Sequence, residues 1–303
     1  MKINHVKGNT YNIETCSSFI PFYKINENDI IMLDSGLYDI ETKIIKDILI
    51  NYNFNVKAVV CSHAHVDHVG NNSWLKEQYN AEIIMPEYES FIFESIYNIK
   101  SYLYKTHIRD MEKIYTPMLF KTDRKISADS EYIVVCGKKF QIVQLHGHSY
   151  YHLGIITPDN VFYVGDSLMS KEVIIESKMS YIADIRKDIE SKEKIRQIKC
   201  DKYILAHKGV YDEIDEIIDA NLSFIEEQVQ FVIDIIRKKP MTFEEVCSEV
   251  FMGLNIRKDV IKYVLTQGII MNFINYFIEY GIVRLEIRDN TLKYCFNKHS
   301  IIN

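Results

Sequence analysis

The sequence predicts an α+β protein in two parts, a larger domain over residues 1–212 and a smaller helical module over residues 213–303. Three observations support this prediction. Short apolar runs bounded by turn residues alternate with stretches of helical periodicity up to about residue 210. Histidine and aspartate directly follow several of those runs. Beyond residue 210, apolar residues recur at helical spacing, and one hairpin signal follows them.

The composition is that of an ordinary globular protein, and it narrows the range of functions. Of the 303 residues, 47% are hydrophobic and 26% are charged, which is typical of folded domains. The net charge of −6 argues against a dedicated nucleic-acid binder. We find no signal peptide before Cys16 and no apolar stretch long enough to span a bilayer, so we expect a cytoplasmic protein without a membrane partner. The six cysteines form no C-x-x-C pair and are expected to be free thiols.

The first predicted elements alternate between strands and helices. Residues 10–34 contain two or three strands, the last of which ends at an Asp34-Ser35-Gly36 turn that caps backbone groups or supports a metal loop. Apolar periodicity then predicts helices over 40–52 and 72–79 and strands over 56–61 and 81–85. Residues 87–127 form an aromatic-rich, mostly helical excursion, which is either a packing layer or a wall that selects the substrate.

The middle of the chain contains two predicted hairpins, a helix and a further strand. The first hairpin spans residues 131–145 with Gly137-Lys138 at its turn, and the second turns at Pro158-Asp159-Asn160. A charged amphipathic helix is predicted over residues 184–198, and it precedes a strand over residues 202–205.

The C-terminal module begins with a long amphipathic helix that ends at Lys238-Lys239-Pro240. Thr242 and Glu245 form a capping box for the next helix, and helices continue to about Gly281. A hairpin with Asp289-Asn290 at its turn comes last. This order suggests a winged-helix-like module. Residues 221–303 contain ten Lys or Arg and ten Asp or Glu, so packing or dimerisation is a better default for the module than nucleic-acid binding.

The six residues from His63 to His68 contain three imidazoles and one carboxylate in the spacing H-x-H-x-D-H. They follow the strand predicted over residues 56–61. Three other predicted strands also deliver such side chains at their ends, namely His148, Asp166 and His207. Imidazole and carboxylate together suit zinc best, with iron or manganese as alternatives. Five histidines and two aspartates are more ligands than one tetrahedral ion can bind, whereas two ions that share a carboxylate would use all seven.

With these motifs the chain resembles the metallo-β-lactamase superfamily, in the hydrolase branch typified by glyoxalase II. The resemblance covers roughly residues 10–210 and rests on H-x-H-x-D-H at 63–68, on Gly147-His148-Ser149, on Gly165-Asp166 and on His207. It implies a four-layer αβ/βα sandwich with its site at one edge between the sheets. The C-terminal helices and hairpin are similar to the winged-helix tail of the β-lactamase-like-2 branch, some members of which cut single-stranded RNA.

The resemblance also implies how the ligands are divided between two metal ions. The first ion would be held by His63, His65 and His148, and the second by Asp67, His68 and His207. Asp166 would bridge the two ions. His65 stands where the oxygen-reducing diiron branch carries glutamate, which argues against that redox role.

Three residues near the motifs are candidates for the substrate side of the site. His146 is an extra imidazole beside the ligand turn, with an exposed or supporting role as the alternative. His152 matches a second family histidine and is either structural or close to substrate. Lys208 places a cation beside His207 and is either solvated or paired with an anionic substrate.

The predicted function is hydrolysis of a small ester, thioester or lactone-like substrate by a metal-bridging hydroxide, with Asp67 as the catalytic residue that orients or deprotonates the attacking water. One alternative is a metal-dependent ribonuclease of the β-lactamase-like-2 type. The other is a mononuclear iron persulfide dioxygenase, which shares the H-x-H-x-D-H framework. The partner is therefore a small molecule, with nucleic acid not favoured and a homodimer left open.

Overall fold

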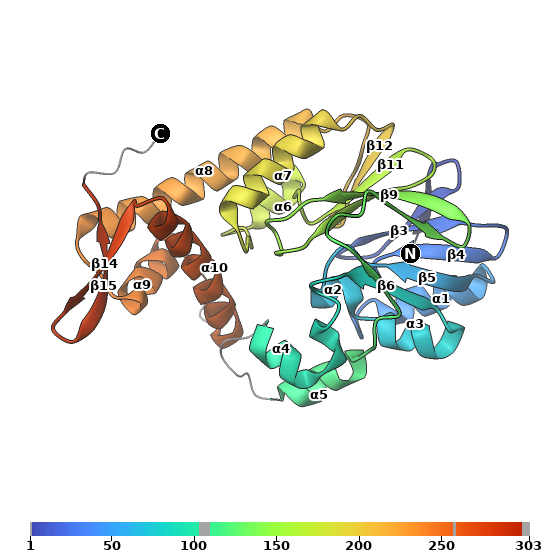
Figure 1. Ribbon diagram of the computed structural model, residues 1–303, viewed down its shortest axis with the longest axis horizontal. Coiled ribbons are helices and arrows are strands. Elements are labelled where there is room, and N and C mark those ends of the chain that lie inside the picture. Colours follow the sequence, from blue (N-terminus) through green and yellow to red (C-terminus); the bar gives the residue numbers. More distant parts are fainter. Residues whose placement is uncertain (1, 103–109, 257–258, 299–303) are drawn as a thin grey trace.

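Two β-sheets face each other and carry helices on their outer sides, as Figure 1 shows. The computed structural model describes residues 2–102, 110–256 and 259–298. The four layers are therefore helix, sheet, sheet and helix. This confirms the α+β sandwich with a C-terminal helical part that the sequence predicts.

The first sheet has seven strands in sequential order from β1 to β7. Its first four strands pair in antiparallel fashion and its last four in parallel fashion. The strands are β1 (Lys2–Lys7), β2 (Thr10–Glu14), β3 (Phe19–Lys24), β4 (Asp29–Leu33), β5 (Asn55–Val60), β6 (Glu82–Pro86) and β7 (Arg124–Ile126). The sequence did not predict β1, because this edge strand is exposed or half-buried throughout and contains no buried apolar run.

The second sheet has six strands in the order β13-β12-β11-β10-β9-β8. Two hairpins, β8–β9 and β10–β11, form at the turns that the sequence predicts. The strands are β8 (Tyr132–Val135), β9 (Lys138–Gln144), β10 (Leu153–Ile156), β11 (Val161–Gly165), β12 (Lys202–Leu205) and β13 (Val210–Tyr211).

Successive side chains of a strand point to opposite faces of its sheet, so the apolar residues form three core layers: one between the two sheets and one under the helices on each outer side. On β4, Ile31 and Leu33 point between the sheets, where they meet Phe140 and Tyr163 of the second sheet. The alternate residues of β4 pack against the outer helices of the first sheet, α1 (Thr42–Asn51) and α3 (Asn72–Tyr79). The opposite outer layer covers the second sheet with α7 (Ile185–Gln197) and the first turns of α8 (Asp215–Lys238).

Residues between β6 and β7 form short helices, which agrees in part with the predicted helical excursion over 87–127, because Arg124–Ile126 near its end form β7 instead. Part of that excursion, residues 103–109, lies outside the described residues. The elements are η1 (Ile92–Glu94), α4 (Ile96–Tyr102), α5 (Met111–Tyr115) and η2 (Thr116–Met118).

The C-terminal module consists of three helices and a hairpin. Helix α8 (Asp215–Lys238) runs from the sandwich into the module along the upper edge of Figure 1. It is followed by α9 (Phe243–Gly253), α10 (Val260–Glu279) and the antiparallel pair β14 (Val283–Arg288) and β15 (Thr291–Phe296). The predicted capping box at Thr242 and Glu245 is present, and Gly281 ends the helices with a φ of 67°.

Helix α8 belongs to both parts of the protein. Ile217 and Ile218 in its first turns pack with Phe162 and Leu205 of the second sheet. Ile225 and Val232 further along it pack with α9 and α10 in a separate core. The proposed boundary between residues 212 and 213 therefore precedes a helix whose first turns complete the core of the larger part. Among the described residues, no helix combines the length and apolarity needed to cross a membrane.

Candidate metal centre

The predicted ligands all lie at one edge of the sandwich, where loops from both sheets meet. His63 to His68 follow β5 of the first sheet and include the short helix α2 (Val66–Val69). The other ligands follow strands of the second sheet, with His148 after β9, Asp166 after β11 and His207 after β12. Two backbone hydrogen bonds tie the sheets together here, from Leu153 N to Ser62 O at 2.8 Å and from Phe19 N to Ala206 O at 2.7 Å.

The ligand atoms fall into two groups, each within 4.8 Å, that share Asp166. Site 1 consists of His63, His65, His148 and Asp166. In site 1, His65 Nδ1 lies 2.9 Å from His63 Nε2 and 3.0 Å from His148 Nε2. Asp166 Oδ2 lies 3.3 Å from His148 Nε2. These separations suit one small ion, because zinc with bonds of about 2.1 Å holds its tetrahedral ligands roughly 3.4 Å apart.

Site 2 consists of Asp67, His68, Asp166 and His207. Asp166 Oδ2 lies 3.3 Å from His68 Nε2, and Asp166 Oδ1 lies 3.4 Å from His207 Nε2. Asp67 Oδ2 lies 3.3 Å from His207 Nε2. All seven predicted ligands thus lie in the two sites, and Asp166 is placed to contact both.

The outward-facing nitrogen of four ligand imidazoles is held by a fixed acceptor. His68 Nδ1 donates to Asp34 Oδ2 at 2.7 Å, and His63 Nδ1 lies 2.9 Å from Ser62 Oγ. Backbone carbonyl oxygens accept from the other two, with Tyr181 O 3.1 Å from His148 Nδ1 and Ser17 O 3.0 Å from His207 Nδ1. Such partners fix the ring orientation and leave the inward nitrogen free to bind a metal.

Two buried atoms of the centre test whether metal ions fit it. His68 Nε2 and Asp166 Oδ1 have no hydrogen-bond partner within the described part of the chain. A buried polar atom without a partner costs free energy, so such atoms call for a ligand. His68 Nε2 belongs to site 2 and Asp166 Oδ1 to the carboxylate that both sites share, and the ligand atoms are all imidazole nitrogens or carboxylate oxygens. The residues present therefore fit divalent transition-metal ions.

The two sites differ in their electrostatics. Burial lowers the pKa of His63 and His65, and it lowers the pKa of His148 to about 3. In site 2, the Asp166 carboxylate raises the pKa of His207 to about 11, although burial opposes this. Burial would also lower the pKa of His68, but the three carboxylates around it hold that pKa well above its usual value.

Asp34 supports the centre from behind and reaches both sites. Its carboxylate accepts hydrogen bonds from Ser62 N at 2.6 Å, Ser62 Oγ at 2.7 Å and Tyr163 OH at 2.6 Å, besides the bond from His68. The residue is 2% exposed and has a φ of 64°, so a turn places this buried anion under the motif. The supporting role that the sequence suggested for Asp34 agrees with these contacts.

Sequence reasoning missed Glu89, which joins two ligand loops. Its carboxylate accepts from Ala64 N at 2.7 Å, from Ser149 Oγ at 2.6 Å and from Tyr151 N at 3.0 Å. The side chain is buried. A single glutamate in a polar turn after β6 carries no pattern that would indicate this role, because its partners lie far away in sequence.

Sequence reasoning also missed how α7 holds the loops of His148 and Asp166. Gly147 approaches α7 so closely, with a φ of 132°, that a Cβ atom there would lie 2.2 Å from Asp188 Cα. Lys192 forms a buried ion pair with Asp188 and donates to Ser167 O at 2.8 Å. Ser191 Oγ donates to His146 O at 2.6 Å. One face of α7 therefore holds both the turn before His148 and the turn after Asp166.

None of the three substrate-side candidates belongs to the two ligand groups, although the ring of His152 packs 4.8 Å from that of His63. His152 is fully buried, with Nε2 3.2 Å from Asp166 N and Nδ1 3.2 Å from Ser167 Oγ, so these contacts favour its structural role. His146 lies 3.1 Å from Gln144 Oε1 and packs against the ring of Tyr151. The Nζ atom of Lys208 lies 3.7 Å from Glu176 Oε2, and about half of the Lys208 side chain is exposed.

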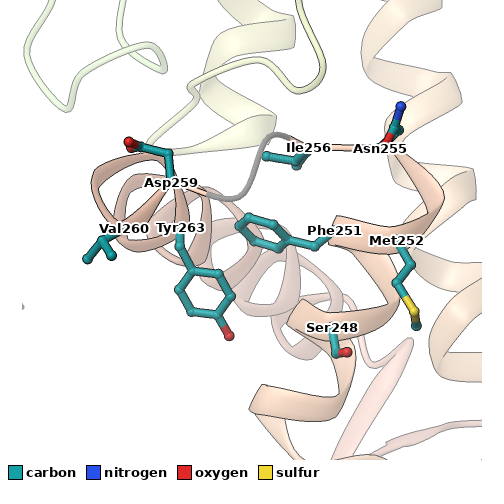
Figure 2. Close-up of a pocket in the computed structure, with 8 residues that line it drawn as sticks. All are labelled: Ser248, Phe251, Met252, Asn255, Ile256, Asp259, Val260 and Tyr263. Atoms are coloured by element: carbon teal, nitrogen blue, oxygen red, sulfur yellow. The ribbon is translucent and has the colours of Figure 1, made fainter.

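Three hollows of the surface are relevant to ligand binding. One of about 250 Å³ is lined by His148, Asp166 and His207 together with residues of α8. A second, of about 540 Å³, lies beside the ligand turn and is lined by Gly147, His146 and four tyrosines. A third, of about 730 Å³, lies between α9 and α10 in the C-terminal module, where Figure 2 shows Phe251 and Tyr263 on its walls, and it contains none of the ligands.

Comparison with known proteins agrees with this fold. Over residues 17–207 the chain matches the family model for the metallo-beta-lactamase superfamily. A metallo-beta-lactamase family protein from Thermus thermophilus has a TM-score of 0.75 at 15% identity, covering 95% of this chain and 99% of that one. A beta-lactamase domain protein from Burkholderia ambifaria has a TM-score of 0.74 at 14% identity, covering 98% and 94%. At these identities the likeness establishes the fold.

A curated sequence relative is the hydroxyacylglutathione hydrolase of Haemophilus influenzae. It is 29% identical over 120 residues, which are 38% of this chain and 51% of the relative. The chain thus spans about half the length of that relative.

Fold and site together define a metal-binding αβ/βα sandwich with its ligands on loops at one edge. The chain belongs to the metallo-beta-lactamase superfamily.

Proposed function

We propose that the protein is a binuclear metal-dependent hydrolase that acts on a small ester, thioester or lactone-like substrate. The observation that carries the proposal is the shared carboxylate of Asp166, which has ligand nitrogens of both sites within 3.4 Å. An arrangement of two ions around one carboxylate serves to stabilise both the attacking and the leaving oxygen of a displacement.

Two bound divalent ions, zinc in this proposal with iron or manganese as alternatives, would polarise the substrate carbonyl and lower the pKa of a water molecule. The chain supplies the positioning. Asp67 lies at the open rim with its side chain 32% exposed, and its carboxylate can orient an attacking water and accept its proton. The ring of Tyr181 packs on His65 at 5.0 Å and on His148 at 5.5 Å, where it covers one side of site 1.

The sequence relative supports an acyl compound as the substrate. Its name describes hydrolysis of a hydroxyacylglutathione, and we extend to this chain only the broader class of ester and thioester hydrolysis. The test combines metal quantitation with a panel of esters, thioesters, lactones and RNA. We expect about two ions per chain and hydrolysis that Asp67→Ala abolishes. The proposal would be contradicted if the purified protein contained no transition metal and if Asp67→Ala left hydrolysis unchanged.

A second candidate, a metal-dependent ribonuclease, is favoured by one feature of the C-terminal module. A hollow of about 620 Å³ between the end of α8 and the hairpin is lined by six cations, which are Arg237, Lys238, Lys239, Arg284, Arg288 and Lys298. Acidic side chains offset part of this charge, since Asp234, Glu249 and Glu286 pair with four of the six. RNA cleavage that falls steeply with salt, without ester hydrolysis, would support this candidate over the first.

The mononuclear iron persulfide dioxygenase is distinguished by metal content. It requires about one iron per chain and oxygen uptake, whereas the complete ligand set of site 2 supports a second ion. Cytoplasmic location, a homodimer and the winged-helix character of the module remain predictions.

A further inference from the structure

A small cavity opens directly beside the metal ligands. It has a volume of about 250 Å³, and His148, Asp166 and His207 form one end of it. A carbonyl group held at the two sites would have its substituents at this end. We call this space the α8 cavity.

The far walls of the α8 cavity are mainly apolar and come from four segments. Leu168 follows β11, Val173 lies on α6 (Lys171–Glu176), and Ile182 precedes α7. Helix α8 contributes Asn221 and Ile225, both buried. Such walls suit a hydrocarbon group, whose transfer from water is favourable in proportion to its apolar area.

Two polar groups on the inner wall distinguish the cavity from ordinary core packing. Ser180 lines it, is 4% exposed, and its Oγ has no hydrogen-bond partner within the described ranges. Lys192 also lines it, with its ammonium group held by Asp188 and by Ser167 O. A hydrocarbon group offers these polar side chains no hydrogen bond, so it would lie against the apolar walls formed by Leu168, Val173 and Ile182.

The volume limits the size of the occupant. About 250 Å³ gives room for roughly eight water-sized groups, less than the pockets that hold drug-sized ligands. Buried residues such as Leu168, Ser180 and Ile225 close the inner end. A partly enclosed space of this size suits the small terminal part of a substrate better than a bulky leaving group.

We propose that the α8 cavity binds the acyl chain of the substrate and that α8 limits this chain to a short one, of about six carbons. The C-terminal module thereby forms part of the substrate site. This inference rests on the proposed hydrolase function, because that function places the acyl carbon at the metal ions. The alternative location for the acyl chain is the open, tyrosine-lined hollow beside His146, which contains Tyr88, Tyr150 and Tyr151.

The test measures binding of the product carboxylates rather than turnover. Acetate, butyrate, hexanoate and dodecanoate are titrated into zinc-loaded protein by calorimetry, with the zinc content of each variant checked first. Each methylene that enters the cavity is expected to tighten binding up to about fourfold. The gain is expected to continue through hexanoate and to be lost for dodecanoate.

Two variants change the cavity in opposite directions. Val173→Trp is expected to fill the cavity. The affinity for hexanoate should then fall at least about tenfold, while the affinity for acetate stays unchanged. Ile225→Ala is expected to lengthen the cavity and to move the preference toward longer chains. Val173 is only half-buried on a helix without buried residues, so its variant remains informative if Ile225→Ala is unstable. Tyr151→Ala, in the tyrosine-lined hollow, is the matched control and is expected to leave the series unchanged.

Failure of this inference is distinguishable from failure of the proposed function. Binding that does not depend on chain length, or a chain-length gain that persists in Val173→Trp, overturns the cavity assignment even when esters are hydrolysed. A gain that disappears in Tyr151→Ala instead assigns the acyl chain to the tyrosine-lined hollow and overturns it as well. Chain-length-dependent binding without hydrolysis of any ester or thioester supports the cavity and contradicts the hydrolase.

Discussion

The two halves of the metal centre share one carboxylate and differ in almost everything else. In site 1 burial favours neutral imidazoles, and the pKa of His148 is lowered to about 3. In site 2 the surrounding carboxylates favour charged imidazoles, and the pKa of His207 is raised to about 11. Site 2 is also closer to solvent, since the side chains of Asp67 and His207 are 32% and 28% exposed.

This difference predicts that the two sites bind their ions in different ways. Site 1 is already in the protonation state that a metal needs, whereas site 2 is a network of ion pairs in which protons take the place of the ion. We expect site 1 to bind its ion first and site 2 to bind in exchange for protons. Substitutions and pH changes test this contrast, beginning with the largest expected effect.

Asp166→Asn should affect both halves at once, because the carboxylate is common to them. The amide weakens both sites, and kcat/KM for a hydrolysed ester is expected to fall at least about a thousandfold. Metal content after dialysis should also fall for both ions. If the variant retains both ions and near-normal activity, Asp166 does not bridge the sites.

Ligand removal in one half should leave the other half intact. His207→Ala is expected to retain about one ion per chain, with activity reduced about a hundredfold. His65→Ala is the matched variant for site 1 and should weaken the first ion to bind. Metal titration monitored with a chromophoric chelator separates the two cases. Equal losses in both variants would show that the sites load as one unit.

Asp34→Asn tests the support that lies behind the centre. It removes the negative charge beside His68 Nδ1 and replaces one of the two acceptor oxygens by an NH2 group, so site 2 affinity is expected to fall about 10- to 100-fold. Ser62→Ala is the control, because Ser62 Oγ lies beside His63 of site 1 and not beside His68. We expect Ser62→Ala to weaken site 1 selectively, and a reversed pattern would contradict the assignment of these contacts.

The pH dependence of metal binding should differ between the halves. The pKa of His207 is about 11 without metal, so binding at site 2 must displace its proton at neutral pH. Site 2 affinity is therefore expected to rise about tenfold per pH unit for each proton released, and site 1 affinity to change little between pH 6 and 8. In the metal-free protein, the same raised pKa stabilises the fold fully below about pH 6.5, and this contribution is lost as pH rises through about 11.

Chelator-buffered titrations at several pH values measure both halves of this prediction. Proton release that accompanies the first ion rather than the second would reverse the proposed order of loading.

Lys208→Asn should have the smallest effect. Asparagine tolerates the φ of 58° at this position, and the exposed pair with Glu176 contributes less than about 1 kcal/mol. Activity on a neutral ester is expected to change less than about twofold. A large loss of activity that is confined to anionic substrates would instead show that Lys208 contacts the substrate.

Much of the metal centre could be predicted because its ligands follow strands that are obvious in sequence. The apolar runs before His63, His148, Asp166 and His207 define strands, and strand ends on one edge of a sandwich bring their loops together. The division into two groups around Asp166 came from the resemblance, and the arrangement of ligand atoms agrees with it.

The parts that could not be predicted depend on contacts between distant residues. Glu89 and Lys192 have no local pattern, and their roles follow only from the loops that they touch. His146 and His152 lie two and four residues from a ligand, yet neither joins the ligand groups, because His146 contacts Gln144 and His152 bonds to Asp166 N and Ser167 Oγ. Proximity in sequence to a ligand is therefore a weak guide to a side chain's direction.

The continuous course of α8 has a consequence for how the protein can vary in length. One inserted residue between Ile225 and Val232 would rotate everything beyond it by about 100° around the helix axis. Either the face that meets the second sheet or the face that meets α9 and α10 would then point to solvent. We therefore expect insertions and deletions to destabilise the protein more in the middle of this helix than in turns such as Lys239-Pro240.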